Sequence, residues 1–386
     1  MRSYFEDMDA LHVVRPNISP RASCHIPEQI HLVETLIDKG YAYETSEGDV
    51  YFSVESFPEY GKLSNRDIEE LEPGARVAVR EEKRHPADFA LWKHAEPEHI
   101  LRWPSPWGEG YPGWHAECTA MATKYLGDTF DIHGGGLENM FPHNECEIAQ
   151  SEAATGEQFA RYWLLVGSLT TNGVKMSKSL GNFLTIKEAL KLYTPEAIRF
   201  FILSSHYRGP VDFSRDAMQA AQRGVERLHN TVRALRHRME QSVPSGTADL
   251  SYITDLDAHR EAFTEAMNDD FNTPKAIAAL FDFSKEVNSL LESGQPVSRG
   301  TLAAIDGLYR DLGGQVLGII PDDLTQEVGG ELVDGLMELI LDLREQAREA
   351  KDWETADTLR DRLNELGISV EDRPEGTTWR VEHKVG

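Results

Sequence analysis

The chain has 386 residues and a formal net charge of −26 at pH 7, because 65 Asp and Glu residues outnumber 39 Lys and Arg. Hydrophobic residues make up 40% of the chain, which is enough for buried cores and excludes intrinsic disorder as a class. With no long apolar run and an acidic N-terminus, we expect neither a membrane span nor a secretion signal. Three cysteines are too few for a disulfide framework and indicate a reducing, cytoplasmic location.

The negative charge of the chain disfavours nucleic acid as a partner. Phosphates are bound by Lys and Arg side chains that displace counterions, so a surface this negative repels them. Any binding of nucleic acid therefore needs a local basic face, or enough salt to screen the remaining charge. The acids are spread along the whole chain, as a salt-adapted cytoplasm would explain.

The first half of the chain predicts helices alternating with strands. Residues 26–39 place apolar side chains at helical spacing between Pro27 and Gly40, which predicts an amphipathic helix. The runs YAYET and DVYFSV, at 41–45 and 49–54, predict a hairpin around a glycine-containing turn. The other elements expected before residue 185 are strands at 75–81, 89–93, 129–133 and 161–167, and helices at 115–126 and at 142–154, with Pro142 in its first turn. This alternation is typical of a parallel α/β sheet.

After about residue 185 the pattern changes to long helices and short linkers. Thr194 and Asn272 are each followed within two residues by a proline, as in the first turn of a helix. Both are expected to cap the N-termini of helices. The helices expected here lie at 194–206, 214–240, 272–291, 331–350 and 354–367, followed by a hairpin at 368–381. The sequence thus predicts an α/β front, a helical bundle and a small C-terminal module.

One loop carries two closely spaced lysines, in the string Lys175-Met176-Ser177-Lys178-Ser179. Small hydroxyl side chains lie beside Lys178, at Ser177 and Ser179, and Gly181 follows, which is typical of a mobile loop. Such a loop can bring two positive charges onto a polyphosphate. The alternative is a solvated lysine loop without a ligand.

A metal site is the second candidate. His143 and Glu147 are four residues apart on an expected helix and share one face, while Cys118 lies near the start of another helix. Thiolate, imidazole and carboxylate are ligands that zinc accepts. The alternative is a buried thiol beside a hydrogen-bonded histidine, since no Cys-x-x-Cys pair supports a metal. Cys146 faces another side of the helix and, like Cys24, is interpreted as an ordinary thiol.

Four strings together resemble the cysteinyl-tRNA synthetases, which are class I aminoacyl-tRNA synthetases. They are GWHAEC at 113–118, DIHGGG at 131–136, FPHNECEIAQ at 141–150 and KMSKS at 175–179. Further strings at 88–93, 269–282 and 347–367 extend the resemblance over nearly the whole chain. The resemblance implies an α/β fold: an incomplete doubly wound (Rossmann-like) catalytic domain with an inserted subdomain, an α-helical bundle and a small C-terminal anticodon-binding module.

The resemblance also implies domain limits. In order, these are a catalytic remnant at 1–20, an inserted connective subdomain at 21–105, the second half of the catalytic domain at 106–185, a helical stem-contact and tRNA-binding bundle at 186–320 and an anticodon-binding module at 325–386. The family's early His-x-Gly-His signature and the Cys before it, a fourth zinc ligand, do not occur in these residues. We therefore expect a chain that lacks an N-terminal portion of roughly a hundred residues.

Roles for the active-site residues follow from the resemblance. Zn²⁺ on Cys118, His143 and Glu147 would hold the thiolate of the substrate cysteine and reject serine. The amino-acid pocket would include Trp114 and His133, whose alternative roles are a core aromatic and a strand-end histidine. ATP, accompanied by Mg²⁺, would be bound by His133, Gly134, Gly135, Gly136, Lys175, Met176, Ser177, Lys178 and Ser179. Lys175 and Lys178 would act in catalysis, on the leaving phosphates.

One departure affects the nucleotide contacts, because Leu137-Glu138 stands where the family usually has Ser-Asp. In the C-terminal module, cations and aromatics suited to unstacked bases are expected at Arg344, Arg348, Lys351, Trp353 and Trp379. The resemblance assigns anticodon contacts to Arg348, Trp353 and Asp357. The alternative is an ordinary acidic helix pair with solvated charges.

The expected activity is therefore the ATP-dependent attachment of L-cysteine to tRNA(Cys), by an enzyme that is a monomer when complete. A cysteine ligase of thiol-cofactor biosynthesis is one alternative, but it has no tRNA-reading tail. A non-catalytic tRNA-binding fragment is another, which the missing N-terminal portion favours. A zinc hydrolase is a third, and the lysine loop argues against it because hydrolases have no polyphosphate to bind.

Overall fold

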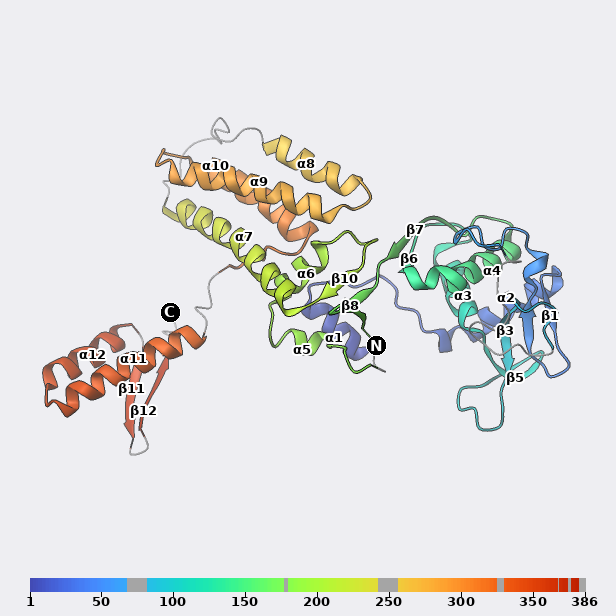
Figure 1. Cartoon of the computed structure of the whole chain (residues 1–386), viewed down its shortest axis with the longest axis horizontal. Helices are drawn as coiled ribbons and strands as arrows, with labels where there is room; N and C mark the ends of the chain where they lie inside the picture. The colour runs from blue at the N-terminus through green and yellow to red at the C-terminus, as the bar shows by residue number, and fades with distance from the viewer. Residues whose placement is uncertain are drawn as a thin grey trace. The chain divides into compact units, whose positions relative to one another are not determined.

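The computed structural model describes residues 1–67, 82–176, 180–241, 256–324, 330–366, 368–373 and 376–381. The chain divides into two compact units, residues 1–322 and 323–386 (Figure 1). Within the described residues, no helix combines the length and apolar character that a membrane span would need.

Between residues 26 and 112, a helix packs beside a five-stranded sheet. The helix is α2 (Ile26–Asp38), and the sheet order is β1 (Ala42–Glu44), β2 (Val50–Phe52), β3 (Phe89–His94), β5 (Gly108–Pro112) and β4 (Trp103–Ser105), all antiparallel. Leu36, Phe52 and Trp92 are fully buried in its core. The predicted helix, hairpin and strand at 89–93 are confirmed, and the predicted strand at 75–81 lies outside the described residues.

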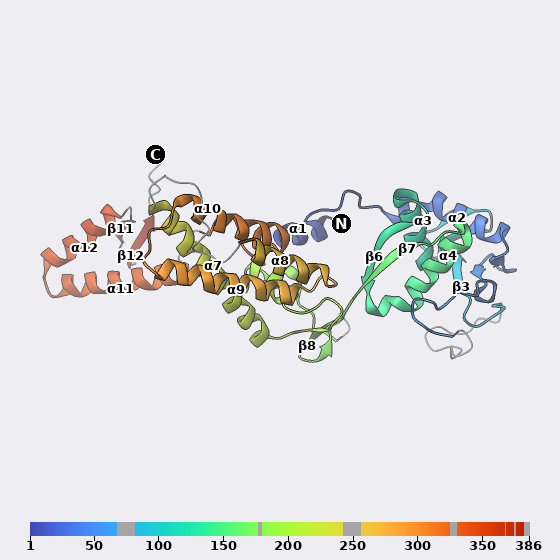
Figure 2. The same cartoon turned by 90° about the horizontal axis from the view of Figure 1, so that it is seen from above.

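A helix–strand–helix–strand segment follows. Its elements are α3 (Trp114–Leu126), β6 (Phe130–Gly136), α4 (Glu145–Thr155) and β7 (Ala160–Val166). β6 and β7 run side by side and parallel (Figure 2), with Gly134 opposite Leu164. The helix expected from Pro142 is present: a wide helical turn runs to Asn144 and the regular helix α4 continues from Glu145, while Phe141, the residue before the proline, is extended at φ −132° and ψ 130°.

A small three-stranded sheet lies next in the chain, in the order β10 (Val211–Phe213), β8 (Leu169–Thr171) and β9 (Val174–Lys175), with β10 parallel and β9 antiparallel to β8. Near it in sequence are α5 (Ile186–Ala189) and α6 (Pro195–Leu203). The N-terminal helix α1 (Arg2–Ala10) meets α5, where Lys187 donates to Glu6 at 3.2 Å. Arg199 of α6 donates from Nη1 to the carbonyl of Leu11 at 2.9 Å and from Nη2 to that of Leu317 at 2.8 Å. This half-buried guanidinium joins three segments that are far apart in sequence.

The helical bundle contains α7 (Arg215–Gln241), α8 (Leu256–Asn268), α9 (Thr273–Glu292) and α10 (Arg299–Leu308), and a wide helical segment continues α10 to Val316. Two predicted caps are confirmed. The Thr194 side chain accepts from the amide of Ala197 at 3.2 Å, and that of Asn272 accepts from Lys275 at 3.3 Å. The side chains that fill the bundle core include Met218, Leu228, Leu235, Leu280, Phe283, Leu302 and Tyr309.

The second unit has the predicted helix pair and hairpin. These are α11 (Gly330–Glu349), α12 (Trp353–Glu365), β11 (Ile368–Arg373) and β12 (Gly376–Val381), and the two strands are antiparallel with Val370 opposite Trp379. Asp352 caps α12 by accepting from the amide of Thr355 at 3.2 Å.

Candidate metal and substrate site

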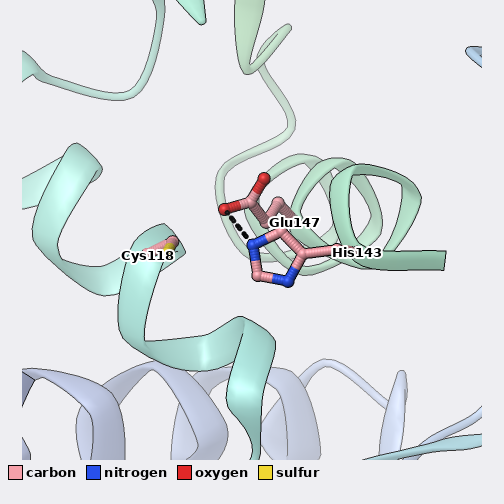
Figure 3. A group of neighbouring side chains, drawn as sticks. All are labelled: Cys118, His143 and Glu147. Atoms are coloured by element: carbon pink, nitrogen blue, oxygen red, sulfur yellow. Dashed lines mark ion pairs between the residues drawn. The ribbon is translucent and has the colours of Figure 1, made fainter. Parts of the chain in front are cut away.

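Two helices bring together the three side chains that the sequence predicted as metal ligands. Cys118 lies on α3, His143 in the turn before α4 and Glu147 in the first turn of α4. Their ligand atoms all lie within 4.8 Å of one another. Figure 3 shows the three side chains pointing toward one another.

The two oxygens of the Glu147 carboxylate have different surroundings. Oε2 accepts from Nε2 of His133 at 3.0 Å and from Nδ2 of Asn144 at 2.9 Å. Oε1 lies 3.4 Å from Nε2 of His143 and has no hydrogen-bond partner among the described residues, although the side chain is fully buried. A buried acceptor without a partner is costly unless a cation or a donor is supplied.

Charge at this carboxylate is set by opposing effects. Burial favours the neutral acid, but the hydrogen bond from His133, the nearby His143 ring and the hydrogen bond from Asn144 outweigh burial and lower the pKa of Glu147 to about 2. The carboxylate is therefore ionised at neutral pH. Beside it, burial first and the charge of Glu147 second raise the pKa of Cys118 to about 12, so that the thiol is protonated when no cation is near.

The donor set fits Zn²⁺. A thiol, an imidazole and an ionised carboxylate with one unpartnered oxygen are the ligand types of zinc sites with an open position. A divalent cation between them would satisfy Oε1 and favour the thiolate, because metal binding displaces the thiol proton.

Trp114 and His133, which were predicted to line an amino-acid pocket, both lie beside this cluster. The ring of Trp114 is centred 5.0 Å from that of His143, and the side chain is 68% exposed, so it is not a core aromatic. The ring of His133 stacks on Trp163 at 4.4 Å, with its Nε2 directed at Glu147. An exposed indole next to a buried donor cluster is suited to covering a small bound molecule.

Sequence analysis did not single out three residues that shape this site. His115 contacts His143, with their Nδ1 atoms 2.7 Å apart, Asn144 donates to Glu147, and Trp163 stacks on His133. His115 stands three residues before Cys118 on the same helix, so its helical spacing was an available signal. Burial first and the charge of His143 second lower the pKa of His115 to about 4, so it is neutral at physiological pH.

Glu145 and Cys146, which precede Glu147 on α4, contact other residues and lie outside the cluster. Glu145 is fully buried and accepts from the amides of Gly61 at 3.2 Å and Ser64 at 2.5 Å. Cys146 is fully buried, and its Sγ lies 3.5 Å from the hydroxyl of Tyr60. Cys146 and the exposed Cys24 are free thiols outside the cluster.

Strand β6 ends with the three glycines that were predicted to contact the nucleotide. Gly134 is exposed at this end of the strand, and the backbone from Gly134 to Gly136 runs beside Leu164 to Val166 of β7. A Cβ on Gly136 would lie 2.8 Å from Oε2 of Glu138, one of the two residues that depart from the family's pattern.

The lysine loop is described in part. Lys175 pairs through its backbone with Thr170 in β8–β9, and the amide of Met176 donates to Leu169 at 3.3 Å. The predicted nucleotide contacts Ser177, Lys178 and Ser179 lie outside the described residues.

In the second unit, the three predicted anticodon contacts are exposed around the turn between α11 and α12. Arg348 lies in the last turn of α11, Trp353 is 57% exposed at the start of α12, and Asp357 pairs with Arg360 at 3.2 Å. Arg344, also expected to face bases, is only 5% exposed. That expectation was wrong, because Arg344 is buried and its cation is not available at the surface.

The fold matches solved structures of class I synthetases. Methionyl-tRNA synthetase of Mycobacterium tuberculosis, in complex with methionyl-adenylate, aligns over 84% of this chain and 78% of its own, with a TM-score of 0.57 and 12% identity. A putative arginyl-tRNA synthetase of Campylobacter jejuni aligns over 83% and 67%, with a TM-score of 0.54 and 12% identity. The chain therefore has the fold of the class I aminoacyl-tRNA synthetases, as the sequence predicted.

Sequence comparisons narrow the class to one family. Residues 1–223 match the family described as "tRNA synthetases class I (C) catalytic domain", 262–321 the "DALR domain", and 337–380 the "Cysteinyl-tRNA ligase anticodon binding domain". "Cysteine--tRNA ligase" of Chlorobium chlorochromatii is 53% identical over 99% of this chain and 78% of its own length. That of Thermus thermophilus is 51% identical, with the same coverage. The chain belongs to the cysteinyl-tRNA synthetase family.

Proposed function

We propose that the protein attaches L-cysteine to tRNA(Cys) at the expense of ATP, and that Cys118, His143 and Glu147 hold a Zn²⁺ ion that receives the substrate thiol. The observation that carries this proposal is the buried Glu147 Oε1, which faces an imidazole and lies near a thiol yet has no hydrogen-bond partner among the described residues. When bound, zinc would hold the substrate thiolate and favour cysteine over serine, whose hydroxyl is a weaker zinc ligand at neutral pH.

The surrounding side chains orient this site. His133 and Asn144 both donate to Oε2 of Glu147, which fixes the carboxylate plane and leaves Oε1 directed at the cluster. Trp114 exposes its ring beside His143, where it can cover the substrate side chain and exclude water. Preorganised hydrogen bonds around the ligand atoms favour one small amino acid over competitors of similar size.

Activation and transfer involve two bond exchanges. The cysteine carboxylate attacks the α-phosphate of ATP, the bond to the β-phosphate oxygen breaks, and pyrophosphate leaves. A ribose hydroxyl at the 3′ end of the tRNA then attacks the carbonyl, loses its proton and releases AMP. Lys175 and Lys178 stabilise charge on the leaving phosphates, with Mg²⁺ accompanying ATP, and Gly134 to Gly136 let the backbone approach the nucleotide.

Replacing Lys178 with alanine is expected to slow cysteine-dependent ATP–pyrophosphate exchange by about 10²- to 10³-fold, with little change in the KM for cysteine. The reason is that its charge acts on the developing negative charge of the leaving group and not on the bound amino acid. Lys285→Ala, which removes an exposed lysine of α9, is the matched control. An exchange rate for Lys178→Ala equal to that of the control would contradict this role.

We also propose that Arg348, Trp353 and Asp357 read the tRNA anticodon. Their exposure around one turn, in the region that matches an anticodon-binding domain, supports this assignment. The indole of Trp353 offers a stacking surface and Arg348 a cation, which are the groups that recognise unstacked bases.

The three free cysteines support a location in the reducing cytoplasm, where we propose that the protein works as a monomer.

The Trp353→Ala variant is expected to weaken tRNA(Cys) binding by about 5- to 150-fold, which corresponds to the loss of one base–aromatic stack. Leu366→Ala is the matched control, because Leu366 is also an exposed apolar residue, 75% accessible, just beyond the other end of α12. Gel shifts would compare both variants on tRNA(Cys) and on the same tRNA with a changed anticodon. The assignment fails if Trp353→Ala weakens binding to both tRNAs equally.

A further inference from the structure

His115 and His143 meet through the same ring nitrogen. Their Nδ1 atoms lie 2.7 Å apart, and both side chains are 9% exposed. A contact this short requires one proton between the two nitrogens, because two lone pairs or two N–H groups facing each other would repel. One ring is therefore the donor at Nδ1 and the other the acceptor.

The direction of this hydrogen bond follows from the opposite side of the His143 ring. Nε2 of His143 faces Oε1 of Glu147 at 3.4 Å, within the group that includes Cys118. A nitrogen that binds a metal must offer its lone pair and cannot carry a proton. If Nε2 is the ligand atom, the neutral ring must carry its proton on Nδ1 and donate it to His115.

We propose that His115 is a positioning residue that fixes the tautomer and the ring plane of His143, so that the Nε2 lone pair is directed at the metal. This inference rests on the zinc site proposed above. His115 would contact neither the metal nor the substrate, and would act only through the hydrogen bond that it accepts from His143. Such outer partners orient ligands and raise their basicity.

The packing of His115 supports a fixed acceptor. Its ring stacks near Trp114, with centroids 5.7 Å apart, and meets the ring of Phe89 edge-on at 5.9 Å. Residues from α3 and β3 thus hold the ring in place, and Nδ1 stays directed at His143. A ring held on two sides can select one orientation of its partner before any metal arrives.

The test measures zinc affinity of the whole chain by competition with a chromophoric chelator at fixed pH. His115→Phe keeps an aromatic ring but removes the acceptor, and is expected to weaken zinc binding by about 10- to 100-fold. His115→Asn places an amide oxygen near the position of Nδ1 and is expected to restore most of the affinity. His229→Phe is the matched control, since His229 is a buried histidine of α7 that hydrogen-bonds to the carbonyl of Ile319 at 2.7 Å.

Cobalt provides a second measurement, because the intensity of its visible bands reports whether the ligands are arranged tetrahedrally. The phenylalanine variant should give a weaker, shifted cobalt spectrum, and the asparagine variant a spectrum close to that of the unchanged chain. If phenylalanine disturbs the packing, as seen by circular dichroism, the smaller His115→Leu makes the same comparison.

The outcomes separate the two proposals. Zinc binding by the unchanged chain that is no tighter than that of Cys118→Ser would overturn the metal site itself. Tight binding by the unchanged chain, matched within twofold by His115→Phe, would overturn the role of His115 alone. Equal weakening in the phenylalanine and asparagine variants would also overturn it, because the effect would then come from packing and not from the hydrogen bond.

Discussion

Replacing Cys118 with serine is expected to lower the affinity for zinc by at least about a hundredfold, because a hydroxyl replaces the only thiolate donor of the cluster. His143 and Glu147 would remain, and two ligands do not close a zinc site. Zinc retained after dialysis against a chelator, measured by atomic emission, gives the result directly.

The matched control for this change is Cys24→Ser, since Cys24 is an exposed free thiol outside the cluster. It should retain as much zinc as the unchanged chain. Equal zinc retention by Cys118→Ser and Cys24→Ser would show that the cluster is a buried thiol beside hydrogen-bonded side chains, which is the alternative that the sequence left open.

The Glu145→Ala variant is expected to lower the free energy of unfolding of the first unit by about 3 kcal/mol. The buried carboxylate accepts from the amides of Gly61 and Ser64, and alanine would leave a buried donor and a partly buried donor without an acceptor. Urea unfolding followed by tryptophan fluorescence measures the change through the shift of the midpoint.

Glu157→Ala, at an exposed glutamate just after α4, is the control and should stay within about 0.5 kcal/mol of the unchanged chain. A Glu145→Ala midpoint equal to that of the control would mean that the loop at 61–64 does not depend on this carboxylate. Glu145→Gln should lie between the two, because one amide oxygen can still accept while the amide nitrogen faces a donor.

Local patterns predicted much of the fold correctly. The helix at 26–39 and the caps at Thr194 and Asn272 depend on residues within a few positions, and the structure confirms them. The helix starting at Pro142 was also predicted from its spacing, but the wide turn to Asn144 that precedes the regular part of α4 was not. Arg344 was expected at the surface because burial of a single charged residue depends on tertiary packing.

For the candidate site too, the sequence predicted some features, and others depend on how the helices pack. The spacing of His143 and Glu147 on one helix, with a cysteine elsewhere, was enough to predict three side chains that the fold brings together. The contact between His115 and His143 requires α3 and α4 to pack at a particular angle, so spacing within one helix could not reveal it. The unequal hydrogen bonding of the two Glu147 oxygens is likewise a property of the packed state.

The guanidinium of Arg199 also sets a constraint on the order of events during synthesis on the ribosome. Its partner Leu11 has been made long before it, but the carbonyl of Leu317 follows 118 residues later in the chain. At about 5 to 20 residues per second, this interval lasts roughly 6 to 24 s. For that time α6 can contact the N-terminal helix while its guanidinium still binds water in place of Leu317. The nascent first unit therefore stays open at this joint until the whole bundle has emerged, and this is the interval in which a chaperone would find it incomplete.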